Sequence, residues 1–417
     1  MAETTIQGSN LFLVKEHNRR AILQSLLYCG ALSRIQLAHQ TGLSATTIGN
    51  LVDEMIAQRL VSEVNGEAAR ECDGKNRLGR PRSHLFLEKN ARYAVGVHMR
   101  VGVFRVGLVN LLGELLTCVE VEFSSQQPAR QVVEQMAEAV RRVMTESGVQ
   151  REQILGVGVG VSGLINYQTG INVLAANFGW RNTPILDWMT DLLNLPVVVD
   201  NNVRCMALGE AMFGVGRGVN SLAFVYGRFG VGAGIVVYGK VFRGSGLGAG
   251  EIGHTTILPE GGPMCRCGKS GCLEPLVSEP ALEMQAQLLA RQHPESILAT
   301  CLREETSLRL VKRLFLALRK GDPWARELVE NSARYLGIAL ANLVNLINPE
   351  LILLGGLFEE EKDIYLPLAH AAMVKHAFGG LGEQVRLQAT SFGWQAGVIG
   401  AASLALAKFL YMNPDKV

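Results

Sequence analysis

The chain has 417 residues, 48% hydrophobic and 19% charged, and its 40 Lys+Arg against 38 Asp+Glu give a formal net charge of +2. This composition excludes a disordered chain and predicts two or three folded domains. The sequence shows no apolar run of about 18 residues and no signal-peptide pattern at its start, so we expect a cytoplasmic protein without a membrane span. Residues 1–100 carry a net +4, which leaves −2 for the remainder and suggests a polyanionic partner for the N-terminal part.

Three helices are predicted in the N-terminal part. Apolar residues recur at helical spacing over Leu11–Leu27. A second, short helix is expected over Ser33–Gly42, because its S-x-x-Q start is a capping box and its final glycine is a typical stop. The third is expected over Ser44–Val61, with the serine as its cap and apolar residues along one face.

The second and third helices are typical of a helix-turn-helix, because a short glycine-containing turn joins them and small polar residues begin the third. In such a motif the first turn of the second helix faces base edges and phosphates. The predicted DNA-contacting positions on these helices are Ser33, Ser44, Ala45, Thr46, Thr47 and Asn50.

A wing is predicted after the third helix. Val61–Val64 and His84–Leu87 have the pattern of short strands, and the polar loop between them carries Arg77, Arg80 and Arg82. Arginines on a Gly/Pro-containing loop suit a narrow minor groove, so we expect these three to bind DNA. The alternative is a three-helix protein-interaction module with a solvated basic loop.

The remainder alternates predicted strands and helices. Strands are expected from Ala94 into the segment before Gly113, over 119–121, 154–163, 196–202 and 351–356, with a hairpin over 221–237 and helices over 128–145 and 337–347. This order predicts an α/β architecture of two similar lobes. A cleft between such lobes is a natural small-molecule site, and the glycine-rich strand ends would let a ligand approach the backbone.

The strongest chemical signal is E-I-G-H at 251–254 followed by C-x-C-x4-C at 265–272. His254, Cys265, Cys267 and Cys272 make a Cys3His set, which is a tetrahedral zinc site with no position left for a reacting water. We therefore expect structural Zn2+. The alternative is a group of buried thiols beside an unrelated histidine.

Two carboxylates flank this predicted metal set. Glu251 lies just before it and Glu274 just after it. Carboxylates accept hydrogen bonds from vicinal sugar hydroxyls, and a metal-braced loop would hold both rigidly. The pattern therefore indicates a sugar site beside the metal.

The combined pattern of E-I-G-H, C-x-C-G-x-x-G-C-L-E and a preceding V-G-A-G-I resembles the ROK family of repressors, open reading frames and kinases. The similarity covers about residues 91 to 405, and the winged part resembles the repressor branch, such as the xylose and N-acetylglucosamine repressors. The resemblance implies an actin-like, hexokinase-like fold, zinc on the cysteine cluster and a sugar between the lobes. The sugar-contacting positions that it implies are Asn177, Asn201, Asn202, Glu251, His254 and Glu274.

The departures from the kinase pattern of that family predict that phosphoryl transfer is lost. The position of the kinase general base holds Asn202, and an amide cannot accept a proton at neutral pH. The first phosphate loop aligns with 98–102, where glycines and a threonine are replaced, and the second becomes 228–230, R-F-G. His98 in the first loop is expected to be a structural histidine.

We therefore expect a winged helix-turn-helix over 1–90, an N-terminal lobe over 91–200 and a zinc-containing C-terminal lobe over 201–417 whose last helix returns to the first lobe. The predicted function is a non-enzymatic, sugar-responsive repressor of carbohydrate genes. It would bind an operator as a homodimer or tetramer, without a membrane partner. The alternatives are a sugar kinase with a DNA-binding appendage and a repressor controlled by a partner protein.

Overall fold

The computed structural model describes residues 11–64, 83–245, 247–304 and 306–412. Its contacts divide the chain into two compact units. The first comprises Met1–Val161, Tyr167–Asp200 and Val398–Val417, and the second comprises Ser162–Asn166 and Asn201–Gly397. The chain therefore passes between the units several times, and its last residues belong with its first.

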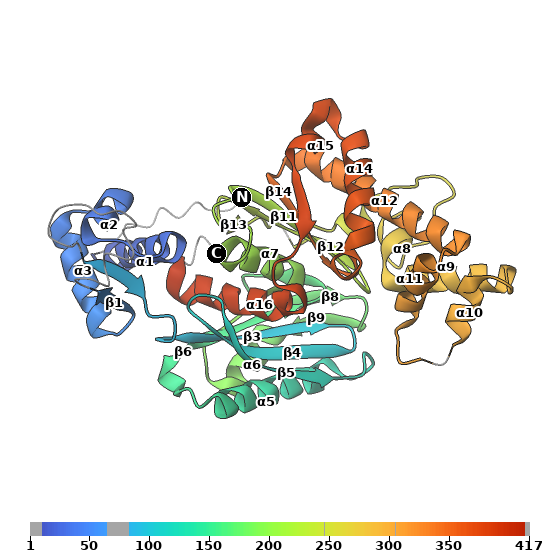
Figure 1. Cartoon of the computed structure of the whole chain (residues 1–417). Helices are drawn as coiled ribbons and strands as arrows, with labels where there is room; N and C mark the ends of the chain where they lie inside the picture. The colour runs from blue at the N-terminus through green and yellow to red at the C-terminus, as the bar shows by residue number, and fades with distance from the viewer. Residues whose placement is uncertain (1–10, 65–82, 246, 305, 413–417) are drawn as a thin grey trace. The chain divides into compact units, whose positions relative to one another are not determined.

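The first unit begins with three helices and an antiparallel strand pair: α1 (Leu11–Cys29), α2 (Arg34–Thr41), α3 (Ala45–Ala57), β1 (Val61–Val64) and β2 (His84–Leu87). The predicted caps are confirmed. Ser33 and Gln36 form a capping box at α2, Gly42 takes the left-handed conformation at its end, and the Ser44 hydroxyl accepts a hydrogen bond from Thr47 N–H. This is the order of elements in a winged helix-turn-helix (Figure 1, blue).

Helix α3 ends earlier than predicted. It ends at Ala57 rather than Val61, because Arg59 takes a left-handed conformation with φ of 56° and Leu60 turns into the core. Val61 then begins β1, whose pairing with β2 closes this part of the unit. The apolar residues after Ala57 continue the helical spacing but belong to the turn and the strand.

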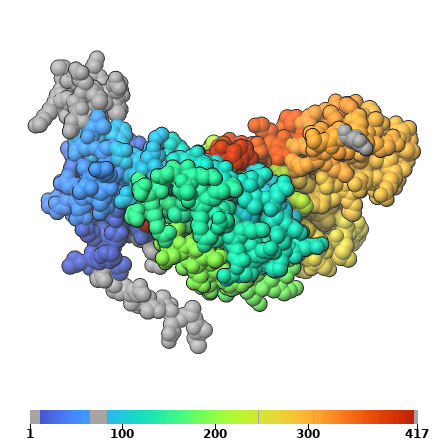
Figure 2. Space-filling view, turned by 90° about the horizontal axis from the view of Figure 1, so that it is seen from below, coloured from blue at the N-terminus to red at the C-terminus, as the bar shows by residue number. Residues whose placement is uncertain are grey.

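A five-stranded sheet forms the centre of the first unit. Its strand order is β10-β6-β3-β4-β5, and the strands are β3 (Tyr93–Arg100), β4 (Val103–Asn110), β5 (Leu115–Glu122), β6 (Ile154–Val161) and β10 (Val197–Asn201). β3, β4 and β5 are a meander, and β6 lies parallel to β3. Helix α5 (Ala129–Ser147) packs on β4 and β5. Its part of the chain is coloured teal to green in Figure 2.

Helix α16 (Ala396–Leu406) covers the opposite face of this sheet (Figure 1). Its backbone comes so close that a side chain on Gly158 of β6 would place Cβ 1.8 Å from the carbonyl oxygen of Ala401. Gly96 on β3 faces the same helix, where a Cβ would lie 2.1 Å from the Val398 carbonyl oxygen. Glycine at these positions therefore serves close packing of a helix on a sheet, not the approach of a ligand.

The end of the chain packs against the first helix. The π-helical turn η5 (Ala407–Tyr411) contacts α1, and the Arg20 guanidinium donates a hydrogen bond to the carbonyl oxygen of Met412. Tyr411 is fully buried, and its hydroxyl donates to the Leu111 carbonyl oxygen at 2.7 Å. Met412 thus accepts a hydrogen bond from α1, and Tyr411 donates one to the residue that follows β4.

Among the described residues, one helical run, Gly393–Tyr411, is long and apolar enough to cross a membrane, and 72% of its most apolar stretch is buried inside the structure. No such run was predicted, because Gln395, Ser403 and Lys408 interrupt the apolar pattern. Core helices of globular proteins have the same length and composition, and burial on the sheet identifies this run as one of them.

The second unit contains a sheet of the same topology. Its strand order is β13-β12-β11-β14-β15, and the strands are β11 (Ser221–Gly227), β12 (Val231–Val237), β13 (Lys240–Val241), β14 (Leu351–Gly356) and β15 (Arg386–Ala389). β11, β12 and β13 are a meander, and β14 lies parallel to β11 and to β15. Both units therefore place three meander strands before two later strands, as expected for the two lobes of an actin-like fold.

Helices pack on this second sheet and extend beyond it (Figure 1). They are α7 (Asn202–Phe213), α8 (Glu274–Val277), α9 (Glu279–Gln292), α10 (Ile297–Arg303), α11 (Leu310–Arg319), α12 (Pro323–Ile347), α13 (Leu357–Glu360), α14 (Lys362–His376) and α15 (Leu381–Gln384). Helix α7 packs on β11 and β12, and α12 packs along α14 within the main apolar core of the unit. The predicted α/β fold class is confirmed.

The first unit also contains an antiparallel pair that was not predicted, β8 (Ile171–Ala175) and β9 (Trp180–Pro184). Asn172 is fully buried opposite Thr183, which is 4% exposed. Polar residues on the buried side remove the alternation of apolar and polar residues by which a strand is found in a sequence. The helix α6 (Ile185–Leu193) follows this pair.

Candidate functional site

The start of α3 lies at the surface of the first unit. Ser44, Ala45, Thr46 and Asn50 are exposed, and Thr47 is half-buried. The buried residues of the helix lie on its other side, so the predicted DNA-contacting residues share an accessible edge. Such an edge of small polar side chains fits the floor of a major groove.

The structure does not place the other predicted DNA-contacting residues on this edge. Ser33 is 5% exposed, and its hydroxyl donates to the Gln36 side chain at 2.9 Å, so its side chain fixes the start of α2. Arg77, Arg80 and Arg82 lie outside the described residues.

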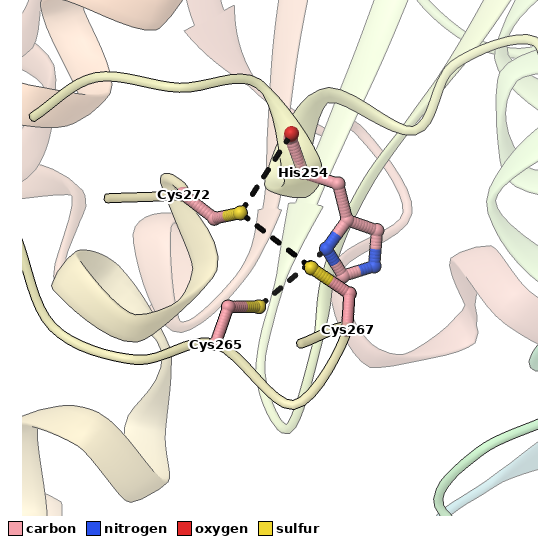
Figure 3. A group of neighbouring side chains, drawn as sticks. All are labelled: His254, Cys265, Cys267 and Cys272. Atoms are coloured by element: carbon pink, nitrogen blue, oxygen red, sulfur yellow. Dashed lines mark hydrogen bonds between the residues drawn. The ribbon is translucent and has the colours of Figure 1, made fainter. Parts of the chain in front are cut away.

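The second unit brings His254, Cys265, Cys267 and Cys272 together (Figure 3). One ligand atom from each lies within 4.8 Å of the others. Nδ1 of His254 is 3.7 Å from the Cys265 sulfur, and the Cys267 and Cys272 sulfurs are 3.7 Å apart. The other ring nitrogen of His254 points away from the sulfurs (Figure 3).

These separations fit a tetrahedral metal. With Zn–S bonds of about 2.3 Å and Zn–N bonds of about 2.0 Å, tetrahedral geometry places two sulfurs roughly 3.8 Å apart and a sulfur and a nitrogen roughly 3.5 Å apart. Burial raises the pKa of the Cys272 thiol to about 12 and also raises the pKa of Cys265, and a bound cation would favour the thiolate form of both sulfurs. The donor set can therefore hold one zinc-like ion with four protein ligands.

The loop that carries Glu251 and His254 lies against β12. At Gly253 a Cβ would be 2.2 Å from the Val231 carbonyl oxygen, which explains the glycine between Glu251 and the histidine. Burial raises the pKa of Glu251 above its ordinary value, against the opposing charges of His254 and Arg204, and Glu274 raises it further. Glu251 and Glu274 therefore lie close enough for their charges to interact.

Glu274 is held at both oxygens. Its Oε2 accepts a hydrogen bond from Val231 N–H at 3.1 Å, and its Oε1 accepts one from the Arg266 guanidinium at 3.0 Å. The Glu274 side chain is 11% exposed, whereas that of Arg266 is 54% exposed. The metal-ligand loop thus supplies a cation to the carboxylate that was predicted to bind sugar.

Asn201 and Asn202 lie at the start of α7. The Asn201 side chain caps the helix by accepting from Val203 and Arg204 N–H, and its amide donates to the Gly163 carbonyl oxygen at 3.0 Å. Asn202 is 5% exposed, and its amide nitrogen lies 3.3 Å from the Ser162 hydroxyl. The first turn of α7 packs on β12, the strand on which Glu274 and the Glu251 loop are also held.

Two predicted residues belong to the first unit. Asn177 is half-buried in the turn between β8 and β9. Its neighbours Phe178 and Trp180 are buried and their rings lie 5.0 Å apart, so the turn is anchored by aromatic packing. His98 is 4% exposed within β3, which agrees with its structural interpretation.

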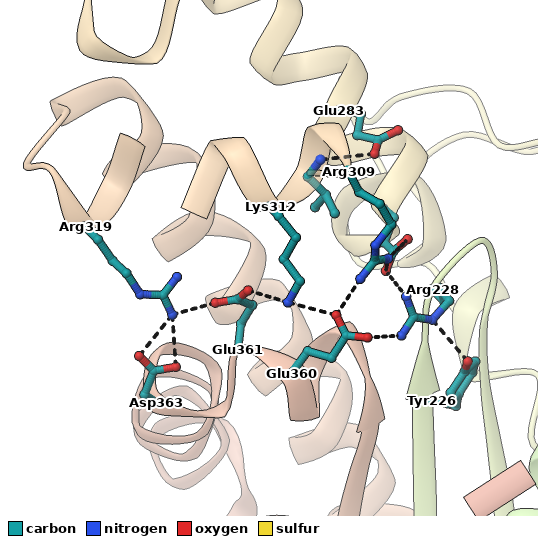
Figure 4. Close-up of polar contacts among 11 residues, drawn as sticks. Tyr226, Arg228, Glu283, Arg309, Lys312, Arg319, Glu360, Glu361 and Asp363 are labelled. Carbon is teal, nitrogen blue, oxygen red and sulfur yellow. Dashed lines mark hydrogen bonds and ion pairs between the residues drawn. The ribbon is translucent and has the colours of Figure 1, made fainter. Parts of the chain in front are cut away.

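Arg228, in the turn between β11 and β12, belongs to an ion-pair network (Figure 4). It donates to Glu279 at 2.9 Å and also pairs with Glu360. Arg309 bonds the same two carboxylates, and Lys312 lies 2.8 Å from Glu360. The guanidinium of Arg228, at the altered second phosphate loop, is therefore paired with carboxylates from α9 and α13.

Arg266 was not predicted as a partner of Glu274, and Arg228 was predicted only as part of the altered second phosphate loop. A local signal exists for Arg266, since it stands between two cysteine ligands and eight residues before Glu274. The partners of Arg228 are 51 and 132 residues away, and no local pattern identifies them.

The model of the ROK family matches residues 94–408. The chain belongs to the ROK family. This match, together with the metal-ligand cluster and the duplicated sheet topology, confirms the predicted family resemblance and defines the body of the molecule.

The repressor-branch resemblance is also confirmed. The chain is 28% identical to a xylose repressor from Caldicellulosiruptor bescii over 96% of this chain and 98% of that one. A solved ROK family transcriptional regulator, described as a homolog of the E. coli MLC protein, superposes with a TM-score of 0.81 at 27% identity, covering 97% of this chain and 98% of that one. A glucokinase from Halalkalibacterium halodurans is 33% identical over 75% of this chain and 94% of its own length.

Proposed function

We propose that this protein is a DNA-binding transcriptional repressor of carbohydrate genes whose operator affinity changes when a sugar binds in its ROK body. The observation that carries the proposal is that a helix-turn-helix with an accessible, capped α3 edge precedes a ROK body. The match to repressors across nearly the whole chain supports it. We further propose that the protein acts in the cytoplasm as a homodimer, whose two heads would bind a palindromic operator.

For DNA, the proposal assigns base contacts to Thr46, Thr47 and Asn50 and phosphate or minor-groove contacts to the wing arginines. Ser44 and Ala45 would complete the α3 edge, and Ser33 would fix α2. Replacing Asn50 with Ala should weaken operator binding by about fivefold or more, because a bidentate base contact contributes about 1–3 kcal/mol.

The wing is tested by salt dependence. Arg80→Ala should reduce the slope of log affinity against log salt by about one unit, since one phosphate contact is lost. Arg181→Ala is the matched control, because Arg181 is an exposed arginine of the body. An equal effect of both variants would contradict a wing that binds DNA.

For the metal, we propose that His254, Cys265, Cys267 and Cys272 hold a structural Zn2+. Four protein ligands leave no position for a substrate or a reacting water. The ion would brace the loop from which Arg266 and Glu274 extend, and would leave the outward ring nitrogen of His254 to contact a ligand.

For the effector, we propose a sugar bound by Asn201, Asn202, Glu251, His254 and Glu274, with Asn177 as a further contact. Vicinal hydroxyls would donate to the two carboxylates, and the amides would bond hydroxyls on the other side. The sugar must bind one of two states of the protein more tightly, and the operator must bind the other state more tightly. Each ligand then lowers the affinity of the protein for the other, because coupling between two ligands is reciprocal.

We propose that the body is not an enzyme. Asn202 cannot serve as a general base, and Arg228 is paired with Glu279 and Glu360 where a kinase has a phosphate-loop hydroxyl. The second candidate is a sugar kinase with a DNA-binding part, favoured by the likeness to a glucokinase. Sugar-dependent ATP hydrolysis that is abolished by Asn202→Ala would replace our proposal with this one.

The deciding experiment is operator binding with and without sugars. DNA fragments selected by the full-length protein are tested by gel shift against a panel of monosaccharides and their phosphates. We expect at least one sugar to change operator affinity and Glu274→Ala to abolish that response while operator binding persists. Operator binding that no sugar changes, together with calorimetry that detects no sugar, would favour control by a partner protein instead.

A further inference from the structure

Arg34 is the first residue of α2, and its guanidinium bonds both α3 and β1. Nη2 donates to Asp53 Oδ1 at 2.8 Å and to Glu63 Oε2 at 2.9 Å. Nη1 donates to the Gly49 carbonyl oxygen at 3.4 Å. Asp53 and Gly49 belong to α3 and Glu63 belongs to β1, so one planar cation joins α2 to both of these elements.

Hydrogen bonds also fix the backbone that carries Arg34. Ser33 and Gln36 form the capping box at the start of α2. Leu32 N–H donates to the Leu85 carbonyl oxygen of β2 at 3.2 Å, and Leu85 N–H donates to the Leu32 carbonyl oxygen at 2.8 Å. The Arg34 side chain therefore extends from a segment that is itself bonded to β2.

Glu63 lies at the end of the strand pair from which the predicted wing extends. It precedes Val64, which pairs with His84 at the last step of the register between β1 and β2. Hydrogen bonds from Arg34 and Ser83 hold the pKa of Glu63 below its ordinary value, so this carboxylate is ionised at neutral pH. The bond between Arg34 and Glu63 is therefore a charge-assisted link between α2 and the base of the wing.

The α3 residues bonded by Arg34 lie on either side of Asn50, to which the proposed function assigns a base contact. Gly49 precedes Asn50, and Asp53 lies about one helical turn after Gly49. The negative charges of Asp53 and Glu63 repel the phosphates of a bound duplex. Their charge therefore opposes DNA binding, and what they contribute to it is the position of the elements that Arg34 joins.

We infer that Arg34 is a positioning residue for operator recognition, which holds α3 at a fixed angle to the β1 and β2 pair through Asp53 and Glu63. The α3 edge and the wing then meet the operator in one preorganised geometry, so specific binding does not have to order them. Mixed-sequence DNA is bound through its phosphates and does not require that geometry. The inference rests on the proposed DNA binding and names a residue that makes this binding specific.

The test compares two affinities of the full-length protein, for an operator that it selects and for mixed-sequence DNA of the same length. We expect Arg34→Met and Glu63→Gln each to lower the ratio of operator affinity to mixed-sequence affinity at least about fivefold. The first substitution removes a cation and the second removes an anion, so charge alone predicts that Glu63→Gln tightens DNA binding. A loss of specificity that both variants share therefore follows from the broken pair.

The matched controls are Lys15→Met and Glu54→Gln. Lys15 of α1 and Glu54 of α3 form an ion pair at 2.7 Å, and their side chains are 49% and 46% exposed. This pair joins α3 to α1 rather than to the strand pair, and exposed ion pairs contribute little. Each control should keep the affinity ratio within about twofold of wild type.

Salt dependence separates a positioning role from a direct phosphate contact. Arg34→Met should leave the slope of log operator affinity against log salt within about 0.3 of wild type, whereas loss of a phosphate contact would reduce it by about one unit. The double variant Arg34→Met/Glu63→Gln should lose little more specificity than either single variant, because both substitutions break the same bond.

Four outcomes would overturn the inference. They are an affinity ratio that does not fall in Glu63→Gln, an equal fall in the two controls, losses that add fully in the double variant, and a salt slope that Arg34→Met reduces by about one unit. If the melting temperature shows that Arg34→Met does not fold, the isosteric Glu63→Gln decides the test.

The proposed function has a separate readout. A wild-type protein that binds its selected operator leaves the proposed function standing in each of the four cases. A wild-type protein that selects no operator would remove the proposed function and this inference with it.

Discussion

At the scale of single residues, Glu360 makes stability sensitive to acid. Burial opposes its ionisation, but Arg228, Lys312 and Arg309 outweigh burial and hold its pKa at about 2, below the usual 4.5. The unfolded chain therefore binds more protons below about pH 4.5, and the stabilisation is lost as the pH falls from there toward 2. We expect Glu360→Gln to lower the free energy of unfolding at pH 7 by about 1–2 kcal/mol, because solvent screens this partly exposed group.

Urea unfolding at pH 7 and at pH 3 measures this effect. The difference between wild type and Glu360→Gln should be large at pH 7 and smaller at pH 3. Glu383→Gln is the matched control, because it removes an exposed carboxylate outside the network. A Glu360→Gln variant with the wild-type pH profile would show that the network does not stabilise the fold.

A second residue-scale prediction concerns Glu210, which is fully buried on α7. It accepts hydrogen bonds from the Thr390 hydroxyl, from Ser391 N–H and hydroxyl at 2.8 Å each, and from Val215 N–H at 3.2 Å. Glu210→Ala should lower the free energy of unfolding by about 3 kcal/mol or more, because it leaves these buried donors without an acceptor. Glu138→Ala, on a side chain that is 76% exposed, should change it by less than about 0.5 kcal/mol in the same urea titration.

The residues of the metal-ligand cluster were predictable because their spacing is short. Three cysteines within eight positions and one preceding histidine are visible in the sequence alone. Arg228 and its carboxylates were not, because ion pairs between α9, α13 and a strand turn depend on the tertiary fold. Long-range charge pairs leave no periodic signal.

At the scale of elements, the metal-ligand loop should behave as a unit. Cys267→Ser should reduce zinc content well below one ion per chain and lower the melting temperature by about 5 °C or more, because a structural metal contributes folding free energy. Metal analysis and thermal unfolding of the purified variant measure both quantities. Cys29→Ser, at an exposed cysteine outside the cluster, should change neither, and unchanged zinc in Cys267→Ser would refute the cluster.

Elements with local signals were predicted well, and elements without them were not. The capping box before α2 and the serine before α3 lie in the sequence as short motifs, and both caps form. The pair β8 and β9 escaped prediction because Asn172 and Thr183 occupy buried positions that apolar residues usually fill. The end of α3 was misplaced because apolar spacing continues past a turn.

At the scale of the whole molecule, the α/β class followed from the order of strands and helices, but the strand order did not. The equivalence of β10-β6-β3-β4-β5 and β15-β14-β11-β12-β13 depends on pairings between strands far apart in the chain. The family resemblance supplied this architecture, since its motifs identify a fold that periodicity alone cannot specify.

The contact of α16 with the first sheet gives a prediction at this scale. Gly158→Ala places a Cβ 1.8 Å from the Ala401 carbonyl oxygen, so the helix must shift, at a cost of about 1–3 kcal/mol in unfolding free energy. Gly49→Ala in α3 is the control, because a Cβ there meets nothing closer than 4.0 Å and should stabilise the helix by up to about 1 kcal/mol. Equal urea midpoints for wild type and Gly158→Ala would contradict the packing.

The return of the chain to its first unit has a consequence for biosynthesis. Val398–Val417 belong to the unit that contains α1 and the first sheet, and α16 covers one face of that sheet. These residues are synthesised after the other segments of both units, so the sheet remains uncovered and Arg20 lacks the Met412 carbonyl until they leave the ribosome. The second unit, whose segments all precede residue 398, can fold earlier. Chains interrupted before residue 398 would thus contain a helix-turn-helix whose unit lacks both α16 and the Met412 carbonyl.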